Sequence, residues 1–193
     1  MDSTAHDAGA SAAQLLAHLS SVLQDVRDSL ALIGGAAVNY WCEPRFTKDI
    51  DFTVVADAAI MARITALLTE DGFAVTRLQE PDAPSGPDFV RFVRPDSRWI
   101  VEFLAAKTEF QALAIERALQ AAEAAPFPIA SREDLIIMKL LANRPHDQSD
   151  AIALAAPSHL DDAYLDHWAS IWEIGDRLER LRAIIRSDQL GVS

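Results

Sequence analysis

Two aspartates, Asp49 and Asp51, stand one residue apart inside an otherwise apolar segment, and this spacing constrains the fold more than any other feature of the chain. The segment is rich in β-branched and aromatic residues, which favours a strand. Successive side chains of a strand point to opposite faces, so both carboxylates project from one face and Ile50 and Phe52 from the other. Two like charges this close repel each other unless a positive group lies between them. A divalent cation with oxygen ligands suits the pair, and Mg²⁺ bound together with phosphates is the best match.

A pair of glycines, Gly34 and Gly35, lies upstream of the aspartates, and residues 36–48 separate the two motifs. The glycines follow an apolar segment and precede a helical pattern. Glycine lets bare backbone N–H groups approach a ligand closely, and the start of a helix favours anions. The pattern therefore predicts a phosphate site at a strand-to-helix turn. Tight packing within that turn is the alternative.

The composition is that of a globular protein, because half of the 193 residues are hydrophobic and 24% are charged. The uncharged segments are too short and too interrupted by glycine to span a membrane, and no basic-then-apolar leader opens the chain. A single cysteine, Cys42, excludes an internal disulfide. Together these features favour a cytoplasmic protein in a reducing environment.

The net charge of −12 argues against a broad nucleic-acid-binding surface, since proteins that grip many phosphates are usually basic. Any contact with RNA would have to be local. The acidity would equally suit a cationic substrate or partner, or would simply confer solubility.

Hydrophobic periodicity predicts alternating strands and helices over most of the chain. The expected strands are residues 30–33, 48–55, 73–78, 89–94 and 99–104, with a hairpin turn at 95–97. The expected helices are 11–27, 34–42, 57–72, 109–124, 131–143, 147–155 and one or two within 161–186. The predicted fold class is α/β in the α+β sense: a mixed five-stranded sheet flanked by helices, with a helical C-terminal portion. We expect residues 1–107 to form the α/β core and 108–193 a helical subdomain.

The segment LIGGAAVNYWCEPRFTKDIDFTV resembles the nucleotidyltransferase superfamily that includes DNA polymerase beta, and more closely its AbiEii toxin-like branch. That branch typically carries an Arg-x-Thr-x-Asp-hydrophobic-Asp sequence, matched here by Arg45, Thr47, Asp49 and Asp51. A second block, SREDLIIMKLLANRPHDQSD, is also similar to the family. The resemblance covers roughly residues 28–155, and two separated motifs in the right order carry it.

This resemblance implies that Asp49 and Asp51 are ligands of two Mg²⁺ ions, and that Gly34 and Gly35 bind the phosphates of a nucleoside triphosphate. Arg45 and Thr47 would assist at the phosphates. A plain ion pair of Arg45 at the surface is the alternative.

The superfamily also implies a third carboxylate on a neighbouring strand, and Glu102 is the candidate because it is the lone charged residue between Trp99 and Ala106. It would ligate metal and help to deprotonate the acceptor hydroxyl. The alternative is an edge-strand acid paired with an arginine such as Arg91.

Lys139 lies in an apolar helical segment, so its amine either reaches solvent or enters a site. By resemblance it would neutralise the triphosphate. Arg144, Asp147 and Asp150 would organise the site, with Asp150 orienting Lys139 or the acceptor. The alternative is that these polar residues are simply solvated.

The resemblance implies a magnesium-dependent enzyme that moves a nucleoside monophosphate from a triphosphate such as ATP to an acceptor hydroxyl. The acceptor would be the 3′ end of tRNA, and a cognate antitoxin protein would be the partner in a toxin–antitoxin or phage-defence system. One alternative is a small cationic acceptor such as an aminoglycoside, which the negative charge would suit. Another is a catalytically silent binding protein that keeps the fold.

Overall fold

The computed structural model describes residues 11–95, 99–118, 125–156 and 159–189. Their contacts separate two compact units. The first holds the described residues up to Ala37 together with Arg45–Ala130, and the second holds Val38–Pro44 and the described residues from Ser131 onwards. The contacts thus divide the chain after Ala130, and not at the expected position after residue 107. The segment after residue 107 stays with the sheet because its helix, α4 (Glu109–Arg117), packs on three strands.

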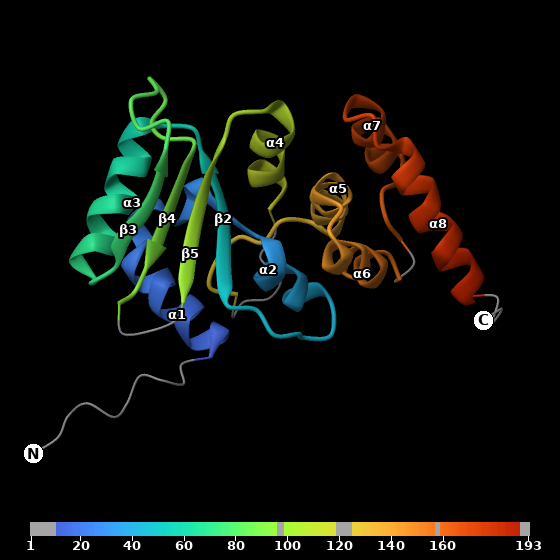
Figure 1. Ribbon diagram of the computed structural model, residues 1–193, viewed down its shortest axis with the longest axis horizontal. Coiled ribbons are helices and arrows are strands. Elements are labelled where there is room, and N and C mark those ends of the chain that lie inside the picture. Colours follow the sequence, from blue (N-terminus) through green and yellow to red (C-terminus); the bar gives the residue numbers. More distant parts are fainter. Residues whose placement is uncertain (1–10, 96–98, 119–124, 157–158, 190–193) are drawn as a thin grey trace, which may run out of the picture. The chain divides into compact units, whose positions relative to one another are not determined.

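The first unit is built on a five-stranded mixed sheet, as the sequence predicted. Its strands are β1 (Leu30–Ile33), β2 (Asp49–Val55), β3 (Ala74–Gln79), β4 (Phe89–Val93) and β5 (Ile100–Ala106). They lie in the order β1-β2-β5-β4-β3, with β2 and β5 parallel and every other pair antiparallel. Figure 1 shows β5 between β4 and β2, so β5 is an interior strand.

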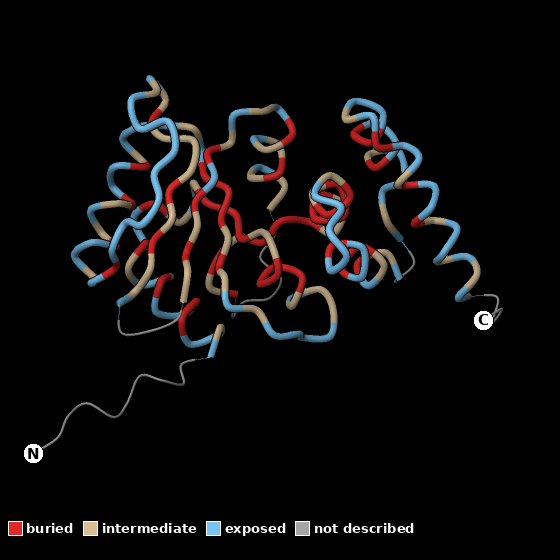
Figure 2. The backbone as a smooth tube through the Cα atoms, viewed as in Figure 1, coloured by how far each residue is buried: buried red, intermediate tan, exposed pale blue. Residues whose placement is uncertain are grey.

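One face of this sheet forms the core of the unit. Ile50 and Phe52 of β2, Val101 and Phe103 of β5 and Phe92 of β4 are completely buried. Except for Thr53 of β2, which is also buried, the alternate residues of the same strands are less buried, as the two-residue period of a strand predicts. Figure 2 shows the contrast between these central strands and the exposed edge strand β3. The period of two therefore places both aspartates of β2 on the face away from the core.

Helices α1 (Ala12–Val22) and α3 (Ala58–Glu70) have side-chain caps at their N-termini. Ser11 and Gln14 form a capping box at the start of α1, and the Asp57 side chain accepts from the Ala59 and Ile60 backbone N–H groups of α3. The helix expected at 11–27 ends at Val22, and a 3₁₀ helix (Gln24–Ser29) continues the chain and keeps Val26 buried.

Two other boundaries differ from expectation. The helix α4 ends at Arg117, because Ala118 adopts an extended backbone; residues 119–124 of the expected helix lie outside the described residues. The expected hairpin turn at 95–97 also lies largely outside them, since residues 96–98 are not described.

The second unit is helical. Its main elements are α5 (Arg132–Ala142), α6 (Pro145–Ala155), α7 (Asp162–Ile171) and α8 (Gly175–Gln189). Pro145 opens α6 two residues before the expected start at 147, since proline fits the first helical turn; Asn143, in a left-handed conformation, ends α5. The helix α2 (Gly34–Trp41) begins in the first unit, and its residues from Val38 belong to the second. No helix in the described ranges is long and apolar enough to cross a membrane.

Candidate active site

The two aspartates of β2 lie on the sheet face that points away from the core. Asp51 stands in register with Glu102 of the parallel neighbour β5, and Asp49 stands in register with Ile100. Both aspartates are half-buried, whereas Ile50 and Phe52 between and after them are fully buried. The structure therefore brings three carboxylates from two neighbouring strands onto one face.

Asp49 carries an unsatisfied atom, since its Oδ1 is buried and has no hydrogen-bond partner. A buried carboxylate oxygen without a partner is costly, and native proteins rarely keep one without a functional reason. This atom is therefore the point on the sheet face where a positive ligand would gain most.

The glycine turn faces the second aspartate. Gly34 has a φ of +66°, a conformation that residues with a side chain rarely adopt. A Cβ added at Gly34 would collide with Oδ2 of the Asp51 carboxylate. The sequence motif Gly-Gly and the sequence motif Asp-x-Asp are thus in direct contact in the fold, and only glycine fits at position 34.

Gly35 faces the loop that precedes β2. A Cβ added there would lie 3.1 Å from Thr47 Oγ1 and 3.2 Å from Arg45 Nη2. Thr47 Oγ1 donates to the Asp49 carbonyl oxygen at 3.1 Å, and Arg45 Nη1 donates to the Phe46 carbonyl oxygen at 3.2 Å. The loop therefore brings an arginine and a hydroxyl to the glycine turn.

Glu102 of β5 pairs with a residue of opposite charge on β4, the neighbouring strand on the side away from β2. Arg91 of β4, in register with it, donates to Glu102 Oε1 from both Nε and Nη2 at 2.5 Å. The arginine pairing considered from the sequence is therefore present. The edge-strand position considered with it is wrong, because β5 lies between β2 and β4.

The aspartate pair fits a divalent cation in its chemistry. It offers hard carboxylate oxygens, one of them without a hydrogen-bond partner, beside a glycine turn at the start of α2. Within the described ranges no three His, Cys, Asp or Glu side chains are arranged to hold one metal ion. With the side chains as they stand, Glu102 contacts Arg91 and does not complete a set of three acids.

The remaining predicted site residues, Lys139, Arg144 and Asp150, lie in the second unit. Lys139 on α5 is only 7% exposed, and its Nζ lies 2.9 Å from Asp147 Oδ1 and 2.8 Å from Asp150 Oδ2 on α6. Arg144 donates from Nε to Asp147 Oδ2 at 2.6 Å. The expected contact between Asp150 and Lys139 is present, and the two aspartates are buried, not solvated.

The electrostatics of this second group are those of a satisfied ion cluster. Burial of Asp147 opposes its ionisation, but hydrogen bonds from Arg144 and Lys139 outweigh burial and lower the pKa of Asp147 to about 2. Asp147 also caps α6, because it accepts from the Arg144 backbone N–H. The group ties α5 to α6.

Sequence reasoning overlooked Arg77 and Phe89, which lie on the same sheet face as the acids. Arg77 of β3 stands in register with Arg91, and both guanidinium groups lie over the ring of Phe89, at 5.4 and 5.8 Å from its centroid. The register of β3 contains a bulge between Val75 and Arg77, and no sequence pattern revealed it.

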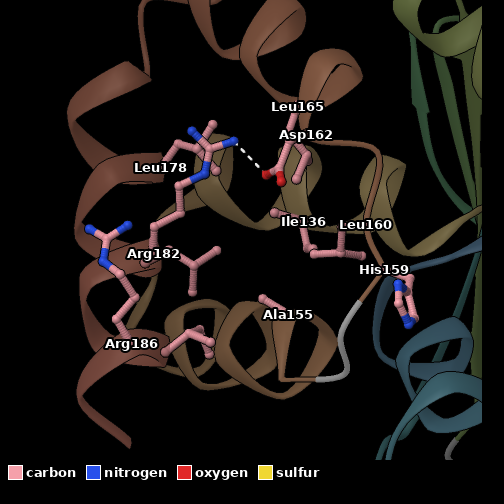
Figure 3. Close-up of a pocket in the computed structure, with 11 residues that line it drawn as sticks. Ile136, Ala155, His159, Leu160, Asp162, Leu165, Leu178, Arg182 and Arg186 are labelled. Atoms are coloured by element: carbon pink, nitrogen blue, oxygen red, sulfur yellow. Dashed lines mark hydrogen bonds and ion pairs between the residues drawn. The ribbon is translucent and has the colours of Figure 1, made fainter. Parts of the chain in front are cut away.

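A pocket of about 260 Å³ lies in the second unit, among residues of α5, α6, α7 and α8. Apolar side chains such as Ile136, Leu165 and Leu178 line it, and Figure 3 shows Arg182 turned toward Asp162. None of the residues predicted for the active site lines this pocket.

Several solved structures are similar to this chain, among them a nucleotidyltransferase-like protein, an antibiotic-resistance factor and a protein called JHP933. An antigenic nucleotidyltransferase-like protein from Paracoccidioides brasiliensis is 17% identical, with 88% of this chain and 90% of that chain covered and a TM-score of 0.50. The antibiotic-resistance factor ANT(2″)-Ia is 18% identical, with 92% of this chain and 93% of that chain covered and a TM-score of 0.48. JHP933 from Helicobacter pylori is 19% identical, with 95% of this chain and 81% of that chain covered and a TM-score of 0.47. At these identities the likeness concerns the fold alone.

A comparison with curated protein sequences gave no match. The family model of the nucleotidyl transferase AbiEii toxin, from type IV toxin–antitoxin systems, matches residues 14–165. That range includes the glycine turn, the aspartate strand and the lysine helix described above. The chain therefore belongs to the AbiEii family of nucleotidyltransferase toxins.

Proposed function

We propose that this protein transfers a nucleoside monophosphate from a nucleoside triphosphate to the 3′-terminal hydroxyl of tRNA, with release of pyrophosphate. Family membership supports the reaction type. The observation that carries the proposal is the unpartnered Oδ1 of Asp49, on a strand whose second aspartate touches the glycine turn. A carboxylate pair left partly unsatisfied beside a glycine turn at a helix start suits a bound cation and a phosphate.

Asp49 and Asp51 would hold two Mg²⁺ ions. Bound there, the metal would supply positive charge for the entering and leaving oxygens of an in-line displacement at phosphorus. The chain's own part is mainly positioning: Gly34 and Gly35 present backbone N–H groups to the phosphates, and the loop carrying Arg45 and Thr47 adds a cation and a hydroxyl.

Glu102 would accept the proton of the acceptor hydroxyl. Its carboxylate is held by Arg91, and it stands in register with Asp51. Arg91 would thereby fix the direction of this carboxylate until the acceptor arrives.

Lys139, Arg144 and Asp150 would support the site through the fold of the second unit. Lys139 was expected to neutralise the triphosphate, but its amine is already bonded to Asp147 and Asp150. These contacts favour a supporting role, in which the cluster keeps α5 and α6 together. A cognate antitoxin would be the protein partner, as the family description implies.

The test is transfer of label from each α-labelled nucleoside triphosphate to tRNA or to an aminoglycoside in the presence of Mg²⁺. We expect label at the tRNA 3′ end, and a loss of at least about a hundredfold for Asp49→Asn, because the chain loses a charge at the reacting phosphorus. Asp57→Asn is the matched control, since it makes the same change at a helix cap of the same unit and keeps the capping group.

The variants are also compared by thermal unfolding. Asp49→Asn removes an unsatisfied buried charge, so the free protein should be as stable as the wild type or more so. Mg²⁺ with nucleotide should raise the unfolding temperature of the wild type and of Asp57→Asn, but not of Asp49→Asn. Label on the aminoglycoside alone would overturn the tRNA acceptor, and full activity of Asp49→Asn would overturn the site.

A further inference from the structure

One row of residues crosses the sheet from β2 to β3 in continuous register. Asp51 stands beside Glu102, Glu102 beside Arg91, and Arg91 beside Arg77. Paired residues of neighbouring strands share a face, so two acids and then two arginines follow one another across the face that carries the candidate active site. The side-chain charge along this row changes from negative on β2 and β5 to positive on β4 and β3.

The positive charges of Arg77 and Arg91 lie directly opposite each other and repel each other. Like charges directly opposite each other on neighbouring strands destabilise a sheet. Glu102 pairs with Arg91 and offsets part of that repulsion. No carboxylate in the described part of the chain pairs with Arg77, although the protein has a net charge of −12 and many acids to offer. An exposed guanidinium group beside a second guanidinium group favours the binding of an external anion.

Phe89 holds both guanidinium groups in position. Its ring lies within 5.4 Å of the Arg77 guanidinium carbon and 5.8 Å of that of Arg91. Cation–π contacts of this kind restrict a flexible side chain, so the two arginines lose less entropy when they bind a ligand. Arg77 is exposed and Arg91 is partly exposed, so both remain accessible.

We propose that Arg77, Arg91 and Phe89, named here the arginine strip, bind the phosphodiester backbone of a single-stranded nucleic acid next to the active site. This inference rests on the proposed function for the identity of the nucleic acid as the acceptor strand. A guanidinium pair matches phosphate oxygens geometrically, whereas it would repel a cationic acceptor such as an aminoglycoside. The strip adjoins Glu102, which pairs with Arg91, so a nucleic-acid strand whose terminal hydroxyl lies near the acids would pass over the arginines.

The strip also resolves the conflict between the acidic composition and an RNA substrate. A chain of net charge −12 cannot attract a polyanion over its whole surface, and its affinity must come from a few local contacts. Few phosphate contacts mean weak binding and a shallow salt dependence. Those two properties are measurable.

The experiment is fluorescence anisotropy with a labelled oligoribonucleotide that ends in CCA, titrated with the full chain without nucleotide at several salt concentrations. Arg77→Glu should weaken binding about tenfold. It should also reduce the slope of log affinity against log salt concentration by the amount expected for the loss of about one phosphate contact. Arg63→Glu is the control with the same charge change in the same unit, on the exposed side of α3. Phe89→Leu should weaken binding less than Arg77→Glu, because the charges remain while their positions are no longer held.

Asp51→Asn separates this inference from the proposed function. It should abolish transfer and leave RNA affinity unchanged or slightly tighter. If Arg77→Glu binds the oligoribonucleotide as tightly as Arg63→Glu, or if the wild type does not bind it, the arginine strip is not a nucleic-acid site. If transfer fails in the wild type while Arg77→Glu still binds about tenfold more weakly, the strip stands and the proposed function falls.

Discussion

The two groups of acidic residues in this protein differ in how well their charges are satisfied. On the sheet of the first unit, Asp49 keeps a buried oxygen without a hydrogen bond. Between α5 and α6 of the second unit, Asp147 and Asp150 both contact the buried amine of Lys139, and Arg144 adds further hydrogen bonds. The first group is incomplete without a ligand, and the second is complete within the chain.

We infer from this difference that the first group serves a ligand and the second serves the fold. A buried charge with partners costs several kcal/mol when one partner is removed, because the other is left unpaired. A buried charge without partners lowers stability as it stands, and a protein retains it where function requires it. We therefore expect changes in the second group to act on folding and changes in the first to act on activity.

The largest expected effect on stability is that of Lys139→Ala. Its removal leaves the Asp147 and Asp150 carboxylates buried without their shared cation, which should cost about 3–5 kcal/mol in the free energy of unfolding. Urea unfolding measures this cost, and Lys48→Ala, an exposed lysine of the first unit, is the control. A loss of nucleotide affinity with unchanged stability would instead assign Lys139 to the triphosphate.

Gly34→Ala should have an intermediate effect on stability and a large one on transfer. A residue with a side chain pays about 1–2 kcal/mol in the left-handed conformation, and its Cβ also displaces the Asp51 carboxylate. Gly72→Ala is a matched control, because Gly72 has a φ of +88° and nothing within 4 Å of an added Cβ. The difference between the two variants in unfolding free energy isolates the collision, and equal transfer activities would show that Gly34 does not position Asp51.

The smallest expected effect is the acid sensitivity of the second group. The pKa of Asp147 is lowered to about 2 in the folded protein, so its contribution is fully present above the unfolded value near 4. It is lost as the pH falls toward 2, by about 2 kcal/mol in total. Unfolding free energies measured between pH 5 and pH 2 should fall more steeply for the wild type than for Asp147→Asn. Parallel curves would contradict the ion cluster.

Much of the fold was predictable because local patterns specify it. The five strands, the caps at Ser11, Asp57 and Ser131 and the alternation in β2 follow from residue type and spacing. Helix boundaries were less predictable. Neither Leu23 nor Ala118 is a glycine or proline, yet the chain leaves the α-helical conformation at both.

The candidate site was predictable in part for the same reason. The contact of Gly34 with Asp51 involves two motifs whose spacing is visible in the sequence. The pairing of Glu102 with Arg91 and the alignment of Arg91 with Arg77 depend on strand order and on a bulge in β3. The register between strands that are distant in sequence has no local signature. The sequence therefore could not decide which of these residues stand opposite each other.

By itself, the sequence determined which residues share a strand face and where most helices begin, and it predicted the glycine turn and the aspartate pair as the candidate site, because these properties depend on neighbours along the chain. Tertiary structure alone decided that Glu102 lies between Asp51 and Arg91 and that Lys139 is enclosed by two aspartates. The physical reason is that a charge's energy depends on the groups around it in space, and folding chooses those groups.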